Sequence, residues 1–198
     1  MIYTLIGKSA SGKDHIYESL INDKTLALSP FVIYTTRPMR EGEKNGREYF
    51  FTDTDGLSAM RSAGKVIEER VYHTVKGDWY YFTADNDSVS VSENSYLGIG
   101  TLESYVKLRD YYGKENVCPL YIEVDPALRL ERSINREREQ KTPNYKEVCR
   151  RFIADEDDFS EEKLKAAGID KRFENNEEIT ICVSRIADYI KSPEGRRT

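Results

Sequence analysis

The start of the chain sets the strongest limit on how this protein can fold. An apolar, strand-like run, Ile2 to Ile6, is followed at once by the segment Gly7-Lys8-Ser9-Ala10-Ser11-Gly12-Lys13. Glycine adopts backbone conformations closed to other residues, so a loop of the form G-x-x-x-x-G-K between a strand and a helix lets successive N–H groups face a polyphosphate. The sequence therefore predicts a phosphate-binding loop whose lysine, Lys13, neutralises the β and γ phosphates.

The residue after this lysine departs from the usual pattern. Asp14 stands where a hydroxyl residue normally ligates magnesium. A carboxylate can hold magnesium directly or through a water molecule, but it also adds negative charge beside a triphosphate. An aspartate is equally suited to the first turn of a helix. Asp14 is thus the candidate metal ligand, with a purely structural role as the alternative.

The hydropathy pattern predicts one α/β domain with a mainly parallel central sheet flanked by helices. Short apolar segments alternate with longer stretches of helical period over the 198 residues. The expected core strands are residues 2–6, 31–35, 96–99, 117–124 and 171–174. The expected helices begin near Lys13, Leu102, Pro126 and Asn176.

Two segments differ in composition from this alternation of apolar and helical stretches. Residues 48–52, 66–72 and 79–83 are rich in aromatic and β-branched side chains, which predicts a small inserted antiparallel sheet. An arginine-rich stretch, residues 129–151, is interrupted at residues 141–144 and predicts two helices joined by a mobile turn. The acidic run that follows, residues 155–158, is typical of a solvated helix face.

Composition excludes several classes of function. With 30 basic and 35 acidic residues the net charge is -5, which gives no general attraction to nucleic acid or to anionic lipid. The 14 tyrosines leave RNA binding only as a remote alternative. No apolar run reaches the ~20 residues of a membrane helix, and no secretion signal opens the chain, so we expect a cytoplasmic protein.

Cysteine and histidine offer no second chemistry. The three cysteines, Cys118, Cys149 and Cys182, are an odd number at wide spacings and are expected to be reduced packing residues. The two histidines, His15 and His73, have no nucleophile or ligand partner at a useful spacing. A zinc site and a hydrolase triad are therefore disfavoured, and nothing in the sequence specifies an oligomeric state.

A second motif carries a family resemblance. The segment from Tyr34 to Phe51 reads T-T-R-x-x-R-x-G-E-x-x-G-x-x-Y-x-F from its first threonine and, with the phosphate loop, closely resembles the guanylate kinase family. The resemblance is strong over the first third of the chain and one of layout beyond it. It implies a P-loop kinase core that uses Mg-ATP to phosphorylate a nucleoside monophosphate, most simply GMP. It also implies a core of residues 1–35, 92–128 and 152–198, a nucleotide-binding insert of residues 36–91 and a helical lid of residues 129–151.

The residue types of this motif suit a monophosphate. Arg37 and Arg40 offer fork-shaped donors and Tyr49 a hydroxyl, which match a dianionic phosphate. By resemblance these three hold the acceptor phosphate, joined by Tyr81. Ordinary decoration of a polar loop is the alternative for the two arginines.

The resemblance also assigns the acceptor base and the donor. Glu68 and the Thr83 hydroxyl would read the base, and Asn175 would approach the adenine of ATP or else cap the last helix. Arg132, Arg136 and Arg138 resemble lid arginines, and Arg151 the arginine of the next helix; surface ion pairing with local glutamates is the alternative for each. The residues expected to act directly in catalysis are Lys13, Arg37, Arg136, Arg138 and Arg151. Those expected to bind ATP are Gly7, Lys8, Ser9, Ala10, Ser11, Gly12, Lys13, Asp14, Arg132 and Asn175.

Three positions depart from the family pattern. Ile33 replaces a serine, and Gly98 and Gly100 replace two aspartates that normally help to organise magnesium and contact guanine. A kinase for another, modified or deoxy nucleotide is therefore one alternative, and Asp14 could restore part of the lost charge. A non-catalytic binding module is the other alternative, although such modules generally lose the phosphate loop that this chain keeps.

Overall fold

The central sheet is parallel throughout. The computed structural model describes residues 1–74, 77–85 and 89–196. Within them, the five strands lie in the order β2 (Leu28–Pro30), β7 (Ser95–Ile99), β1 (Ile2–Ile6), β8 (Val117–Glu123) and β9 (Arg172–Glu174). Each neighbouring pair runs in the same direction. The expectation of an α/β fold around a mainly parallel sheet is confirmed.

Strand β1 is buried on both of its faces and organises the core. Tyr3 and Leu5 pack into one hydrophobic cluster, and Ile2 and Ile6 into a second cluster on the opposite face. This two-sided burial explains why the strand reads as an unbroken apolar run. The helices that contribute to the first cluster are α1 (Lys13–Asn22) and α7 (Ile179–Lys191), and those that contribute to the second are α3 (Leu102–Tyr112) and α6 (Glu161–Ala166).

A smaller sheet carries the inserted segment. Its order is β4 (Phe50–Phe51), β3 (Tyr34–Thr35), β6 (Gly77–Ala84) and β5 (Val66–Thr74), and α2 (Thr54–Ser62) packs against it through Leu57 and Phe82. The strand pairs β5–β6 and β3–β6 are antiparallel, as expected, whereas β3–β4 is parallel.

The expectation of one core strand over residues 31–35 is wrong. The core strand β2 ends at Pro30, and Tyr34 and Thr35 already pair with β6 of the small sheet. Residues 31–33 belong to neither strand and carry the chain from the central sheet to the small one. A proline is tolerated at the end of β2 because this strand lies at the edge of the central sheet.

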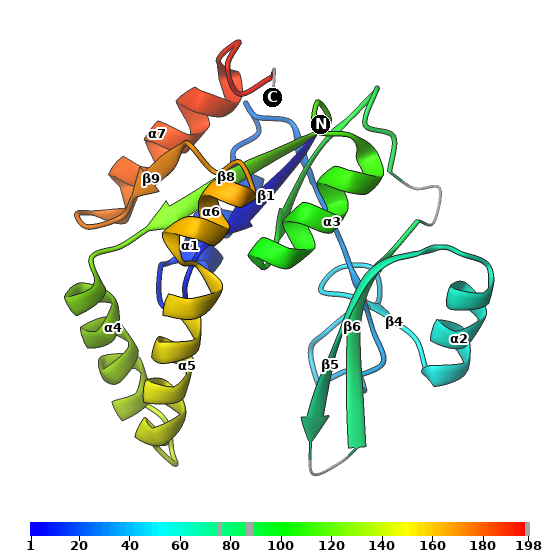
Figure 1. Ribbon diagram of the computed structural model, residues 1–198, viewed down its shortest axis with the longest axis horizontal. Coiled ribbons are helices and arrows are strands. Elements are labelled where there is room, and N and C mark those ends of the chain that lie inside the picture. The colour runs from blue at the N-terminus through cyan, green and yellow to red at the C-terminus, as the bar shows by residue number, and fades with distance from the viewer. Residues whose placement is uncertain (75–76, 86–88, 197–198) are drawn as a thin grey trace.

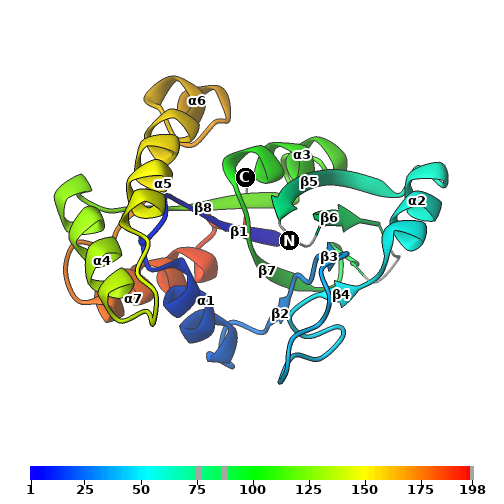
Figure 2. The same cartoon turned by 90° about the horizontal axis from the view of Figure 1, so that it is seen from below.

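Two groups of elements flank the central sheet. Helices α4 (Pro126–Arg138) and α5 (Tyr145–Asp158) lie to one side, and the small sheet with α2 lies to the other (Figures 1 and 2). The arginine-rich stretch therefore forms two helices joined by a connection, as expected. The last helix begins at Ile179, three residues later than expected, after Glu178 as its N-cap.

Three further expectations concern the cysteines, membrane-spanning segments and the bounds of the expected domains. Cys118 and Cys182 are buried, whereas Cys149 is exposed on α5, so the expectation of a packing role is wrong for Cys149. Among the described residues no helix is long and apolar enough to cross a membrane. The expected ranges 36–91 and 152–198 include residues 75–76, 86–88 and 197–198, which lie outside the described residues.

Candidate active site

The phosphate loop connects β1 to α1 in a shape that its glycines permit. Gly7 has a φ of +153°, and a Cβ there would lie 2.6 Å from the backbone oxygen of Ile122. Gly12 has a φ of +89° and serves as the N-cap of α1. Any larger residue at position 7 would push β8 away, and a residue other than glycine at position 12 would be strained. The loop therefore leads into a helix N-terminus, the geometry that favours an anion.

Lys13 folds back over this loop. Its ammonium group donates hydrogen bonds to the backbone oxygens of Gly7 at 2.6 Å and Lys8 at 2.9 Å. Burial lowers the pKa of Lys13 to about 8, an effect that the nearby carboxylates of Asp14 and Asp155 partly oppose. A partly buried ammonium held by neutral carbonyls is poised to exchange them for the oxygens of an anion.

Asn175 supports the phosphate loop through a hydrogen bond to its backbone. Its side-chain N–H donates to the backbone oxygen of Ser11 at 2.9 Å, and the residue is 3% exposed. A Cβ at Gly12 would lie 2.7 Å from the same amide nitrogen, so the loop and Asn175 fit closely. The alternative expectation that Asn175 caps the last helix is wrong, because Glu178 occupies that position. A contact between Asn175 and adenine stays a prediction.

An arginine that the sequence analysis gave no role anchors the other side of the loop. Arg129 is 1% exposed and pairs with Asp155 at 3.0 Å and with Glu156 at 2.5 Å. Its guanidinium also lies 4.0 Å from the centroid of the Phe152 ring. Asp155 accepts a hydrogen bond from the Ser9 backbone N–H at 2.7 Å. Helices α4 and α5 are thereby joined to the loop through one buried cation.

The acidic run on α5 is consequently not one solvated face. Asp155 and Glu156 point toward the loop, where Glu156 also pairs with Lys8 at 2.6 Å, while Asp157 and Asp158 are exposed. The expectation of a solvated face is therefore wrong for the first two residues. The helical period explains the split, because neighbouring acidic residues on a helix point to different sides.

The motif between β3 and β4 builds a second cationic centre. Arg37 is 3% exposed, and its guanidinium forms a two-pronged ion pair with Glu43 at 2.7 and 3.1 Å. This pair raises the pKa of Arg37, and a smaller contribution comes from Tyr81. The Arg37 guanidinium also lies 5.6 Å from the Tyr49 ring, whose edge meets Tyr81. Three of the four expected phosphate ligands thus lie together, while Arg40 is exposed nearby and donates its backbone N–H to Glu43 at 2.6 Å.

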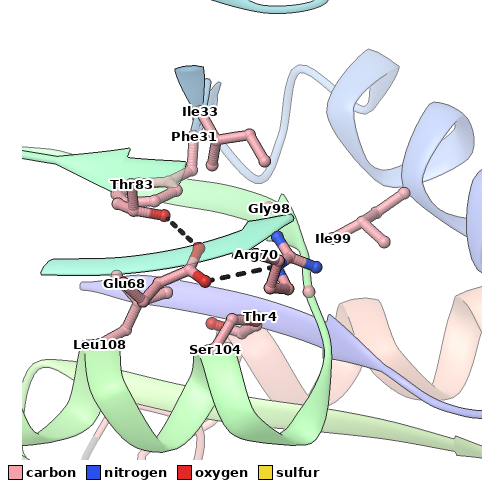
Figure 3. Close-up of a pocket in the computed structure, with 11 residues that line it drawn as sticks. Thr4, Phe31, Ile33, Glu68, Arg70, Thr83, Gly98, Ile99, Ser104 and Leu108 are labelled. Carbon is pink, nitrogen blue, oxygen red and sulfur yellow. Dashed lines mark hydrogen bonds and ion pairs between the residues drawn. The ribbon is translucent and has the colours of Figure 1, made fainter. Parts of the chain in front are cut away.

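Glu68 and Thr83 face one another in a cavity between the two sheets. The Thr83 hydroxyl donates to Glu68 Oε1 at 2.9 Å, and Arg70 Nε lies 3.3 Å from Glu68 Oε2 (Figure 3). Glu68 and Thr83 are 8% and 3% exposed. The residues that line the cavity are Thr4, Phe31, Ile33, Glu68, Arg70, Thr83, Gly98, Ile99, Gly100, Ser104 and Leu108. A buried carboxylate beside a hydroxyl is suited to adjacent N–H donors of a ligand.

The candidate lid arginines are distributed unevenly. Arg136 and Arg151 line a second cavity together with Ser9 of the phosphate loop. Arg138 donates instead to the side chain of Asn135 at 3.1 Å, and neither Arg138 nor Arg132 lines this cavity. The described residues contain no cluster of three or more carboxylate, histidine or cysteine side chains suited to a metal, and Asp14 is exposed at the start of α1.

Comparison with known proteins agrees with this geometry. Residues 1–83 match the family model for guanylate kinase. A guanylate kinase from Porphyromonas gingivalis is 26% identical over 185 residues, which cover 92% of each chain. One from Cupriavidus metallidurans is 35% identical over 80 residues, or 40% of this chain. That alignment spans only about a third (35%) of the relative's own length. The crystal structure of guanylate kinase from Anaplasma phagocytophilum shares the fold, with a TM-score of 0.60 at 23% identity over 96% of this chain and 84% of that one.

The first 83 residues are thus similar to guanylate kinases, and the chain shares the fold of one. Close packing of neighbouring side chains explains why Gly98 and Gly100 stand at the end of β7. A Cβ at Gly98 would lie 3.1 Å from the Phe31 side chain, and a Cβ at Gly100 would lie 2.5 Å from Ser104 Oγ. The space that the guanylate kinase pattern gives to two carboxylates is therefore filled here by Phe31 and Ser104.

Three residues of the site were not predicted from the sequence. Glu43 was visible in the family motif but was given no partner. Arg70 lies two residues after Glu68, and residues spaced by two share a face of a strand, so this signal was available. Arg129 could not be recognised, because only the folded chain brings it to Asp155 and the loop.

Proposed function

We propose that this protein transfers a phosphoryl group from ATP to GMP, giving ADP and GDP, in the cytoplasm. The observation that carries the proposal is one chain that presents Lys13 on a phosphate loop and, in the small sheet, a buried Glu68–Thr83 pair together with the buried Arg37. A donor site and an acceptor site are both needed for such a transfer. Matching of residues 1–83 to the guanylate kinase family supports the same assignment.

The donor phosphates would be held by the loop and its lysine. The backbone N–H groups of residues 7–12 and the N-terminus of α1 supply partial positive charge, and Lys13 supplies a full one. Magnesium, when bound with ATP, neutralises charge on the phosphates. Asp14 is the residue that would hold it, because its carboxylate stands directly after Lys13 in the first turn of α1. A single carboxylate fits an ion that takes most of its ligands from phosphate and water.

The acceptor phosphate would lie against Arg37, Arg40, Tyr49 and Tyr81. In the free protein Glu43 occupies the guanidinium of Arg37 with both of its oxygens. A dianionic phosphate matches the same fork, so it would share or replace this pairing. Glu68 would accept the two adjacent N–H groups of guanine while the Thr83 hydroxyl turns to its carbonyl oxygen.

Transfer would be direct and without a protein nucleophile. The enzyme's contribution is to align the two nucleotides and to place positive charge on the group in transit. Arg136 and Arg151 are the best placed of the lid arginines, because they line a cavity with Ser9 of the loop; Arg132 and Arg138 would join on closure of residues 129–151. Closure would also exclude water, which prevents hydrolysis of ATP.

The test is ADP formation from Mg-ATP against a panel of acceptors. The panel is GMP, dGMP, IMP, AMP, UMP, CMP and dTMP. The proposal predicts selective turnover of GMP or dGMP, and loss of roughly 100-fold or more of kcat in Lys13→Met. Lys24→Met, an exposed substitution beyond the end of α1, is the control and is expected to keep full activity. Preference for another acceptor, or no turnover of any, would overturn the proposal.

A further inference from the structure

Arg70 forms an unusual third member of the Glu68–Thr83 cavity. It follows Glu68 by two residues on β5, and its side chain is 22% exposed. Figure 3 shows its guanidinium and the Thr83 hydroxyl on opposite sides of the Glu68 carboxylate. Across the cavity the groups therefore follow the order hydroxyl donor, carboxylate oxygen, carboxylate oxygen and guanidinium donor.

Most of the donor capacity of Arg70 is unused. Its Nε lies 3.3 Å from Glu68 Oε2 but is not aligned for a hydrogen bond, and this buried N–H has no acceptor among the described residues. A guanidinium carries five N–H donors. The ion pair with Glu68 balances the charge of Arg70, but the N–H groups of its guanidinium can still donate hydrogen bonds to other acceptors.

The side chains of the cavity wall offer few acceptors for those donors, and among the described residues that line it the Thr4 hydroxyl is the one that has no partner of its own. Gly98 and Gly100 bring no side chain, and Phe31 and Ile33 are apolar. The Ser104 hydroxyl is already engaged with the backbone of Thr101, accepting from its N–H at 2.8 Å and donating to its oxygen at 3.0 Å. An acceptor for Arg70 is therefore most readily supplied by a ligand.

Strand register fixes the direction in which this set of groups reads a nucleotide. Arg70 lies opposite Tyr81, and Glu68 lies opposite Thr83. Because Tyr81 meets Tyr49 beside Arg37, Arg70 is on the phosphate side of Glu68 and Thr83 is on the far side. A purine nucleotide bound with its phosphate at Arg37 would turn its sugar-side edge, which carries N3, toward Arg70.

We infer that Arg70 is a specificity-determining residue that donates a hydrogen bond to N3 of the guanine base. Guanine presents an acceptor (O6), two donors (N1–H and the 2-amino group) and an acceptor (N3) in this order. These complement Thr83, the two oxygens of Glu68, and Arg70. The inference rests on the proposed function, and it assigns the base contact on the side of the cavity where Gly98 and Gly100 leave no carboxylate.

The same order disfavours related bases. Hypoxanthine lacks the 2-amino donor, so one oxygen of Glu68 would have no ligand partner. Xanthine places an oxygen against Glu68 and a protonated N3 against Arg70, so it reverses two of the four pairings. Unpaired or reversed groups in a buried site give strong discrimination.

The experiment is a cycle that pairs a protein change with a ligand change. Wild type and Arg70→Met are each compared with GMP and with 3-deaza-GMP, in which N3 is replaced by a C–H group, measuring both the Kd and the KM. Wild type is expected to bind 3-deaza-GMP roughly tenfold to a hundredfold more weakly than GMP, the range for a hydrogen bond to a charged group. In Arg70→Met this ratio is expected to fall close to one, because the coupling has been removed.

Controls separate this inference from the proposed function. Arg61→Met removes an exposed arginine that pairs with Glu69 on the neighbouring position of β5, and it is expected to keep the wild-type ratio. Arg70→Lys, which keeps a charged donor, is expected to keep part of it. Absence of GMP turnover in wild type would overturn the proposed function. Equal ratios in wild type and Arg70→Met, or equal affinity of wild type for the two ligands where Arg70→Met does not fold, would overturn the inference.

Discussion

The carboxylate of Asp155 accepts a hydrogen bond from the backbone N–H of Ser9 at 2.7 Å. One of the amides expected to face phosphate is thus occupied by the protein's own carboxylate, which is carried on α5. The same carboxylate pairs with the buried Arg129. Binding of ATP must therefore change this contact before the loop can use all of its N–H groups.

Asp155→Ala is expected to bind ATP more tightly than wild type. The phosphate no longer has to displace a charged acceptor from Ser9, a hydrogen bond worth about 1.5 kcal/mol, or roughly tenfold in Kd. Calorimetric titration with ATP measures the change. Asp157→Ala is the control, because Asp157 is exposed on the same helix. Equal affinities in wild type and Asp155→Ala would show that this contact does not compete with ATP.

Arg129→Met is expected to lower the free energy of unfolding by about 3 kcal/mol. The substitution leaves Asp155 and Glu156 without their buried partner, and the cost is at the lower end for such pairs because Glu156 is partly exposed. Urea denaturation measures it. Arg150→Met is the matched control: Arg150 pairs with Glu147 on the surface of α5, and its loss should cost about 0.5 kcal/mol or less. Similar losses in the two variants would refute a structural role for Arg129.

Affinity of the free enzyme for ATP is expected to fall as the pH rises through about 8, the value to which burial lowers the pKa of Lys13. The charged ammonium attracts phosphate, and bound phosphate favours this charged form, so saturating ATP moves the fall to higher pH. Titrations of ATP binding between pH 7 and 9.5 measure it. In Lys13→Arg the side chain stays charged and the fall attributed to Lys13 should disappear.

The same pKa has a consequence for stability. Between pH 8 and 10.5 the folded protein binds fewer protons at Lys13 than the unfolded chain, whose lysine keeps its ordinary value. The contribution of Lys13 to the free energy of unfolding therefore rises with pH over this window. Comparison of Lys13→Met with wild type by urea denaturation at pH 7.5 and 9.5 isolates this contribution; a difference that does not change with pH would contradict it.

Gly100→Ala is expected to destabilise the protein by roughly 1 to 3 kcal/mol, through overpacking against Ser104 Oγ, which would lie 2.5 Å from the new Cβ. Ser104 cannot readily move because it is buried and completes the capping box of α3. Ser104→Ala alone should cost about 1 kcal/mol through loss of the hydrogen bond that the Ser104 hydroxyl accepts from the Thr101 backbone N–H. The double variant should cost clearly less than the sum of the two, and strict additivity in denaturation experiments would exclude the proposed clash.

Local features of the sequence were enough to predict the centre of the fold. The run from Ile2 to Ile6 became the middle strand because burial on both faces demands an unbroken apolar segment. The phosphate loop was predictable because Gly7 and Gly12 permit backbone conformations with positive φ, and Lys13 follows them at the spacing of the motif. The crossing at residues 31–35 was not predictable in the same way, because the strand before it ends at Pro30 and the strand after it, which begins at Tyr34, belongs to a different sheet.

The supports of the site were less accessible to sequence reasoning. The contacts of Arg129 with Asp155 and of Asn175 with Ser11 join residues that are far apart in the chain. No local pattern distinguishes a buried arginine from the exposed arginines beside it on α4. Arg70 differs, because its spacing from Glu68 placed both on one strand face, but its meaning depends on the glycines that face it across the cavity.

The hydrogen bond from Asn175 to the Ser11 oxygen spans 164 positions of the chain. During synthesis from the N-terminus, the phosphate loop is therefore made before Asn175 and receives this support only after residue 175 has also left the ribosome. A nascent chain ending after residue 83 would contain the complete family match yet would lack β7, β8 and Asn175. The support of the loop by Asn175 accordingly arises long after the loop itself has been made.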